Sequence, residues 1–82
     1  MRILGKNSSA DAYRVAIDLG GTEIVALVSD ALLSQQYGTD EKVSHDQAYE
    51  WIAAQQHDLN DAITALHKGA APRAPFTHIT LE

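Results

Sequence analysis

The chain has 82 residues, no cysteine and a net charge of −5, and 45% of its residues are hydrophobic. This length suits one modest core, and the hydrophobic fraction indicates a globular chain rather than a disordered one. The lack of cysteine excludes disulfides and thiolate chemistry, and the acidic balance disfavours direct binding to nucleic acid. Because no apolar run resembles a signal peptide or a membrane span, we expect a single cytoplasmic domain over residues 1–82.

The first half of the chain predicts strands. Met1–Leu4 is expected to form a short strand or an ordered arm, and Asn7–Ser9 a loop. Tyr13–Leu19 alternates apolar and polar residues, as a strand with one buried face does, and Thr22–Val28 forms a second apolar run. The Gly20-Gly21 pair between them can adopt the positive φ angles of a two-residue turn, so the two runs predict a β-hairpin.

A short helix should follow the hairpin. Ser29 or Asp30 can cap its first turn, because a side-chain oxygen there accepts a hydrogen bond from a free backbone N–H. The helix should cover residues 31–37 and end at Gly38.

A long helix is predicted from Ser44 to about Lys68, with Gly69 as its stop. Ser44 and Gln47 match a capping box. At 100° per residue the apolar side chains share one arc, in which Gln55 is the lone polar residue. Within this helix, His57–Asp61 is the stretch where a break is most favoured, because Asp and Asn compete for backbone hydrogen bonds.

The C-terminal part predicts a linker and one more strand. Ala70–Pro75 cannot stay helical across its two prolines, and Phe76–Leu81 is expected to add to the sheet. We assign no function to Leu81-Glu82, which can be a cloning remnant.

These elements predict an α+β fold of ββααβ order, in which an antiparallel sheet of about three strands is covered by one long and one short helix. The expected core residues are Val15, Ile17, Ile24, Val28, Leu32, Leu33, Ile52, Leu59, Ile63 and Leu66.

Acidic residues are concentrated between Asp40 and Asp61, where six acids and one base account for the whole net charge. On the predicted long helix, the arc opposite the apolar one carries Asp46, Glu50, His57, Asp58 and Asp61. A solvated helix face is the structural interpretation of this pattern, and a docking surface for a basic protein partner is the functional one.

The stretch Ile17–Ile24 reads IDLGGTEI and resembles the first phosphate-binding motif of the sugar-kinase and actin-like ATPase superfamily, especially the ROK sugar kinases. The matching residues are Asp18, Gly20, Gly21 and Thr22. The resemblance implies a glycine turn presented to nucleotide phosphates, with Asp18 near the metal. Glu23 departs from the family's pattern and adds negative charge beside such a phosphate. The resemblance is confined to this short stretch.

The order of elements is similar, over most of the chain, to that of small bacterial proteins in a domain family of unknown function. The pattern consists of a strand, a glycine turn, a strand ending in Val28-Ser29, an Ala-Leu-Leu helix ending at Tyr37-Gly38, a long helix and a final strand. This resemblance implies no activity, cofactor or catalytic residue.

Neither a metal centre nor a catalytic group is expected. His45, His57, His67 and His78 lack metal-ligand spacing, and a stable zinc site needs three or four ligands. Ser29 and Ser44 are interpreted as caps rather than nucleophiles.

Three functional hypotheses follow. The first is a non-enzymatic interaction module that presents the acidic arc to a basic protein. The second is a structural or regulatory homodimer, with Trp51 or an open sheet edge at its interface. The third is a phosphate- or nucleotide-binding hairpin at Gly20-Gly21.

Overall fold

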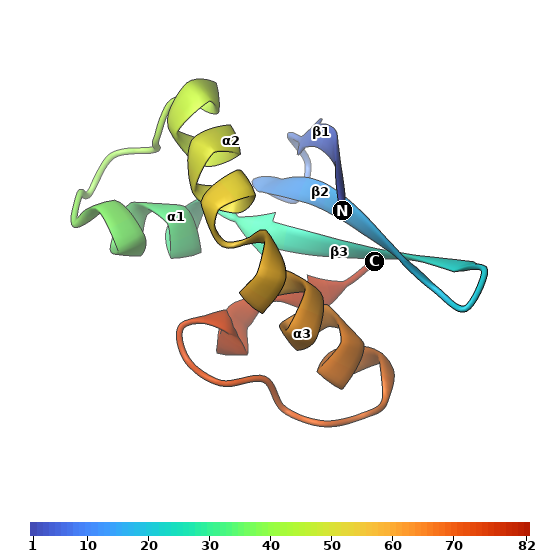
Figure 1. Ribbon diagram of the computed structural model, residues 1–82. Helices are drawn as coiled ribbons and strands as arrows, with labels where there is room; N and C mark the ends of the chain where they lie inside the picture. The colour runs from blue at the N-terminus through green and yellow to red at the C-terminus, as the bar shows by residue number, and fades with distance from the viewer.

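Four antiparallel strands form one sheet in the order β1-β2-β3-β4, and three helices lie on one side of it (Figure 1). The computed structural model describes residues 1–82. The strands are β1 (Arg2–Asn7), β2 (Ala12–Leu19), β3 (Thr22–Ser29) and β4 (Thr80–Leu81), and the helices are α1 (Asp30–Tyr37), α2 (His45–Ala54) and α3 (Gln56–His67). The predicted α+β class is confirmed, with one more strand and one more helix than expected.

The hairpin of β2 and β3 is the centre of the sheet. Its register pairs Tyr13 with Val28 and Ile17 with Ile24, so the alternating apolar residues of both strands share one face. Gly20 and Gly21 have φ angles of 58° and 88°, which glycine adopts without a steric penalty. The predicted hairpin is therefore confirmed.

Strand β1 is longer than the expected arm. It pairs with β2 from Arg2 to Asn7, with an irregularity between Ile3 and Gly5. Gly5 has a φ of 116°, a conformation that favours glycine. The Asn7 side chain accepts hydrogen bonds from the backbone N–H groups of Ser9 and Ala10, which closes the turn into β2.

Local signals place α1 and the start of α2 where the sequence predicts them. Ser29 accepts a hydrogen bond from the Leu32 N–H at the start of α1, and Gly38 ends that helix in the left-handed conformation. At α2, Ser44 accepts from the Gln47 N–H while the Gln47 side chain accepts from the Ser44 N–H, so the capping box is present.

The prediction of one continuous helix from Ser44 to Lys68 is wrong. The chain turns at Gln55, whose φ and ψ angles are −101° and 12°, and α3 begins at the next residue. A straight helix would direct the polar Gln55 side chain into the apolar arc, and the turn leaves this side chain half-buried instead. The break therefore lies before His57–Asp61, the stretch where the sequence most favours one.

The final strand is shorter than predicted. Residues Phe76–His78 form a 3₁₀ turn, and only Thr80–Leu81 is strand, paired with Leu27 and Ala26 of β3. Phe76 and Ile79 are nevertheless buried, so the segment anchors the core through these two side chains. The Arg14 guanidinium donates to both Glu82 carboxylate oxygens at 2.6 Å, and this pairing lowers the pKa of Glu82.

The core lies between the sheet and the helices. Eight of the ten predicted core residues are buried, while Ile24 and Leu66 are only partly buried. The structure adds further buried apolar residues to this cluster: Tyr13, Ala26, Val43, Ala48, Ala62, Phe76 and Ile79. The opposite face of the sheet carries no helix, and the half-buried Val25 and Leu27 lie on it.

Candidate functional site

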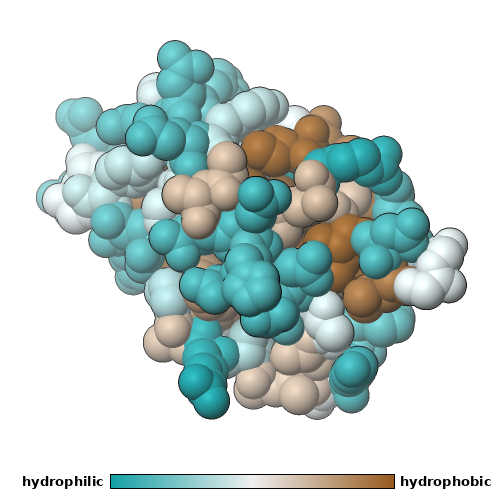
Figure 2. Space-filling model, in the orientation of Figure 1, coloured by the Kyte–Doolittle hydropathy of each residue, from teal (hydrophilic) through white to brown (hydrophobic).

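The acidic residues singled out from the sequence lie on α2 and α3. All of them are exposed, and we call them the acidic surface: Asp46, Glu50, His57, Asp58 and Asp61. Figure 2 shows the side of the molecule on which these helices lie, and most of its surface is hydrophilic. Asp46 and Asp58 also sit in the first turns of α2 and α3, where a negative charge stabilises the helix dipole.

The break at Gln55 divides the acidic surface into two parts. Asp46 and Glu50 are one turn apart on α2, and Asp58 and Asp61 are one turn apart on α3. Within the second part, His57 Nε2 lies 3.7 Å from Asp61 Oδ2. The structure thus brings the five residues together as two clusters on successive helices rather than as one continuous stripe.

Four of the protein's six lysine and arginine side chains are paired away from this surface. Lys6 pairs with Asp30, Arg14 with Glu82 and Arg2 with Glu23. Lys42 is the single base in the acidic stretch, yet its Nζ lies 3.2 Å from Asp11 Oδ1 and 3.7 Å from Asp30 Oδ2. Hydrogen bonding to Asp11 raises the pKa of the Lys42 ammonium.

As a result, no lysine or arginine pairs with any of the six acids between residues 40 and 61: Asp40, Glu41, Asp46, Glu50, Asp58 and Asp61. Their charges are therefore free to act on a partner. Complementary surface charge raises association rates and selects partners of opposite sign.

A groove lies beside the α3 part of the acidic surface. It runs between α3 and the segment of residues 71–76, and Asp58, Asp61 and Arg73 are its charged lining residues. Ala62, Ala65 and Phe76 contribute apolar lining. Its volume of about 460 Å³ falls within the ~300–1,000 Å³ of sites that hold small ligands. The groove was not predicted, because it depends on how residues 71–76 return along α3.

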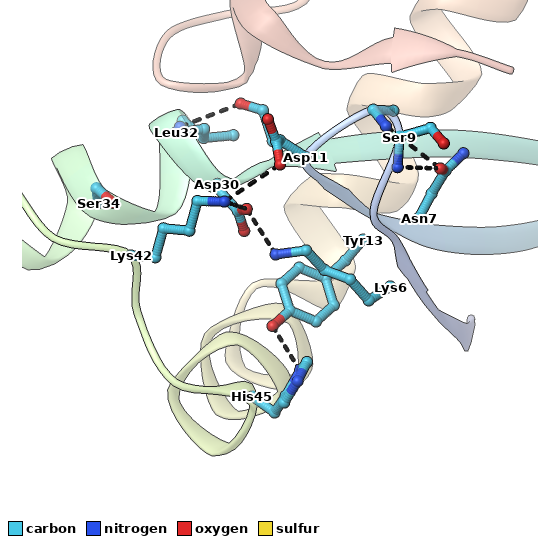
Figure 3. Close-up of polar contacts among 12 residues, drawn as sticks. Lys6, Asn7, Ser9, Asp11, Tyr13, Asp30, Leu32, Ser34, Lys42 and His45 are labelled. Atoms are coloured by element: carbon cyan, nitrogen blue, oxygen red, sulfur yellow. Dashed lines mark hydrogen bonds and ion pairs between the residues drawn. The ribbon is translucent and has the colours of Figure 1, made fainter.

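A second polar cluster, which was not predicted from the sequence, surrounds Asp30 (Figure 3). Asp30 is the only charged residue that is buried, with 4% of its surface exposed. Its Oδ2 lies 2.5 Å from Lys6 Nζ, and its Oδ1 has no hydrogen-bond partner. Its backbone N–H donates to the Asp11 carbonyl at 2.8 Å, which joins the end of β3 to the start of β2.

Tyr13 and His45 extend this cluster towards α2. The Tyr13 hydroxyl and His45 Nδ1 share a hydrogen bond of 2.8 Å, and Lys6 Nζ lies 4.8 Å from the centre of the Tyr13 ring. Burial is the main cause that raises the pKa of the Tyr13 phenol. The strand pattern placed Tyr13 on the same face as Val15, and a buried hydroxyl needs a partner. The strand pattern therefore predicts that the Tyr13 hydroxyl has a hydrogen-bond partner, but it does not identify the partner residue.

The hairpin turn has an arrangement that disfavours an anion. The Gly21 N–H donates to Asp18 Oδ1 at 3.0 Å, so this group, which a phosphate-binding motif would offer to the ligand, is already bonded. Asp18, Glu23 and Arg2 provide the charged side chains that line the pocket beside the turn, and Arg2 pairs with Glu23. Two carboxylates and one guanidinium leave the lining side chains with a net charge of −1, which disfavours a phosphate.

The remaining expected features are readily located. Trp51 is half-buried, and its ring centre lies 6.1 Å from that of Phe76. No three His, Cys, Asp or Glu side chains come close enough together to hold a metal ion. None of the helices is long and apolar enough to cross a membrane.

Comparisons of this chain with protein-family models, curated protein sequences and solved structures found no match.

Proposed function

We propose that the protein is a non-enzymatic interaction module that presents the acidic surface of α2 and α3 to a basic segment of another protein. One observation carries this proposal: the six acids between residues 40 and 61 have no lysine or arginine partner, whereas four of the six cationic side chains pair with acids outside that stretch. The negative sign of this surface favours a basic protein and disfavours the phosphate backbone of a nucleic acid.

The test is affinity capture from a lysate of the source organism, with the wild-type protein and a neutralised variant as parallel baits. The variant carries Asp46→Asn, Glu50→Gln, Asp58→Asn and Asp61→Asn, all at exposed positions. We expect a basic protein on the wild-type bait that elutes as salt is raised and is absent from the variant bait, because salt screens exposed charges.

A control variant carries Asp40→Asn and Glu41→Gln, which remove two charges from the connection before α2 and leave the acidic surface intact. It should capture the same basic protein as the wild type. If the neutralised variant captures the same proteins at the same salt, the proposal is wrong.

Self-association is the second candidate function. The observation that favours it is the sheet face without helices, on which Val25 and Leu27 are half-buried. A two-fold pair could bury this face against its own copy. Sedimentation velocity over a wide concentration range tests this, and a protein that stays monomeric at the highest concentration removes the homodimer.

A further inference from the structure

The groove beside α3 combines an acidic side with an apolar remainder. One side carries Asp58 and Asp61, which point from adjacent turns of the same helix. The remainder is lined by small and apolar side chains, among them Ala62, Ala65 and Phe76. Alanines on both α3 and the returning segment leave room between them, since a larger side chain at these positions would fill the space.

This combination suits a guest that is apolar along its length and cationic at its end. Arginine and lysine both have such side chains, which bury their methylene groups and keep the charge at a polar site. Arginine fits better here, because its planar guanidinium offers several N–H donors and can bond to two carboxylates at once.

The charge of the lining sets how many cations the groove can take. Asp58, Asp61 and Arg73 are its charged members, so the lining has a net charge of −1. Arg73 makes no ion pair within the chain. One guest cation neutralises the lining, and a second would meet repulsion from Arg73.

We propose that this groove receives one arginine side chain from the basic segment of a protein partner. The guanidinium bonds to the carboxylates of Asp58 and Asp61, and the methylene groups lie along Ala62, Ala65 and Phe76. The inference rests on the proposed function, and it makes the α3 part of the acidic surface the specific contact. The α2 part then contributes mainly long-range attraction.

The test uses a blocked peptide of alternating arginine and glycine as the probe, titrated into the whole protein and followed by backbone amide shifts in NMR. The variant Asp58→Asn/Asp61→Asn should weaken binding by about tenfold or more, because it removes charge-assisted hydrogen bonds. The matched control Asp46→Asn/Glu50→Gln removes the same charge from α2, and it should weaken binding by less than about threefold, as remote exposed charges do.

A third variant separates the effect of the groove's shape on binding from the effect of net charge. Ala65→Leu narrows the groove without changing any charge, and leucine is compatible with a helix. It should weaken binding, and Ala71→Leu on the opposite side of the groove replaces it if Ala65→Leu fails to fold. Arg73→Gln should strengthen binding, because it removes a repulsive charge.

The outcomes distinguish the two proposals. If the two double variants lose affinity equally and the groove-filling variant loses none, only net charge acts, and the groove inference is wrong while the proposed function stands. If a lysine–glycine peptide of equal charge binds as tightly, the preference for arginine is refuted. If neither peptide binds the wild type at low salt, both proposals fail.

Discussion

Asp30 shows how the fold accommodates a charge that it buries. A carboxylate removed from water needs a partner, and Lys6 provides one at 2.5 Å. The Lys6 side chain is itself only 21% exposed, so each of the two charges is stabilised by the other in place of water. Removing the Asp30 charge leaves the Lys6 ammonium partly buried without a counter-charge.

We expect Asp30→Asn to lower the free energy of unfolding by about 1–3 kcal/mol, because Lys6 then lacks its counter-charge. Replacing both side chains, as Lys6→Met/Asp30→Leu, should cost less than the single change, since no unpaired charge remains. Urea unfolding followed by circular dichroism measures both, with the exposed Asp40→Asn as the control. A single variant as stable as the wild type would show that the ion pair has no net effect.

Tyr13 should make the stability of the protein depend on pH in the alkaline range. Burial raises the pKa of its phenol in the folded protein above the value of about 10 for a free tyrosine. The resulting stability is fully present below pH ~10 and is lost as pH rises through the folded pKa, because the unfolded phenol ionises first. The ultraviolet absorbance of tyrosinate, followed during an alkaline titration, should therefore contain a late component, which is the part that appears only above pH ~10.

The variant Tyr13→Phe should remove that late component, and Tyr49→Phe should retain it. Tyr49 is the suitable control because it is exposed, although its ring lies near that of Tyr13. A late component that disappears with Tyr49 rather than with Tyr13 would contradict the assignment.

At the level of elements, side-chain caps mark where α1 and α2 begin. The reciprocal bonds of Ser44 and Gln47 satisfy two backbone groups at the start of α2. These bonds are local, so they were readable from the sequence. They also position His45, the first residue of α2, beside Tyr13.

We expect Ser44→Ala to lower the free energy of unfolding by about 1 kcal/mol, through loss of the cap. Ser9→Ala is the control, because the Ser9 hydroxyl makes no hydrogen bond and the bond from Ser9 to Asn7 uses the Ser9 backbone N–H. Thermal unfolding followed by circular dichroism provides the comparison. Equal stability of the two variants would mean that tertiary contacts alone hold the start of α2.

For the whole molecule, the segregation of charge has a thermodynamic consequence. The acidic surface places like charges one turn apart on both α2 and α3, and no lysine or arginine compensates them. Such pairs destabilise a helix slightly, and added salt screens the repulsion.

Added salt should therefore stabilise the wild-type protein, by about 0.5–1 kcal/mol between low and high ionic strength. The variant with Asp46, Glu50, Asp58 and Asp61 neutralised should show a smaller response, because the repulsion is already gone. Urea unfolding at several sodium chloride concentrations measures this. An identical salt response in both proteins would show that the acidic surface is not self-repulsive.

The sequence by itself determined the features that depend on neighbours along the chain. The hairpin follows from alternation around Gly20-Gly21, α1 from Ser29 and Gly38, and the start of α2 from its capping box. These are backbone hydrogen bonds and φ preferences settled within a few residues, so local patterns reveal them. The exposure of the acidic residues followed from helical periodicity alone.

Only the tertiary structure decided which distant residues meet. The turn at Gln55 depends on the core, which excludes a polar side chain from the apolar arc. The short β4 depends on the burial of Phe76 and Ile79. Lys6 reaches Asp30 across 24 positions of the chain, and Tyr13 reaches His45 across 32. The groove beside α3 exists because residues 71–76 fold back along that helix. These contacts are selected by packing across the whole chain, and no local spacing encodes them.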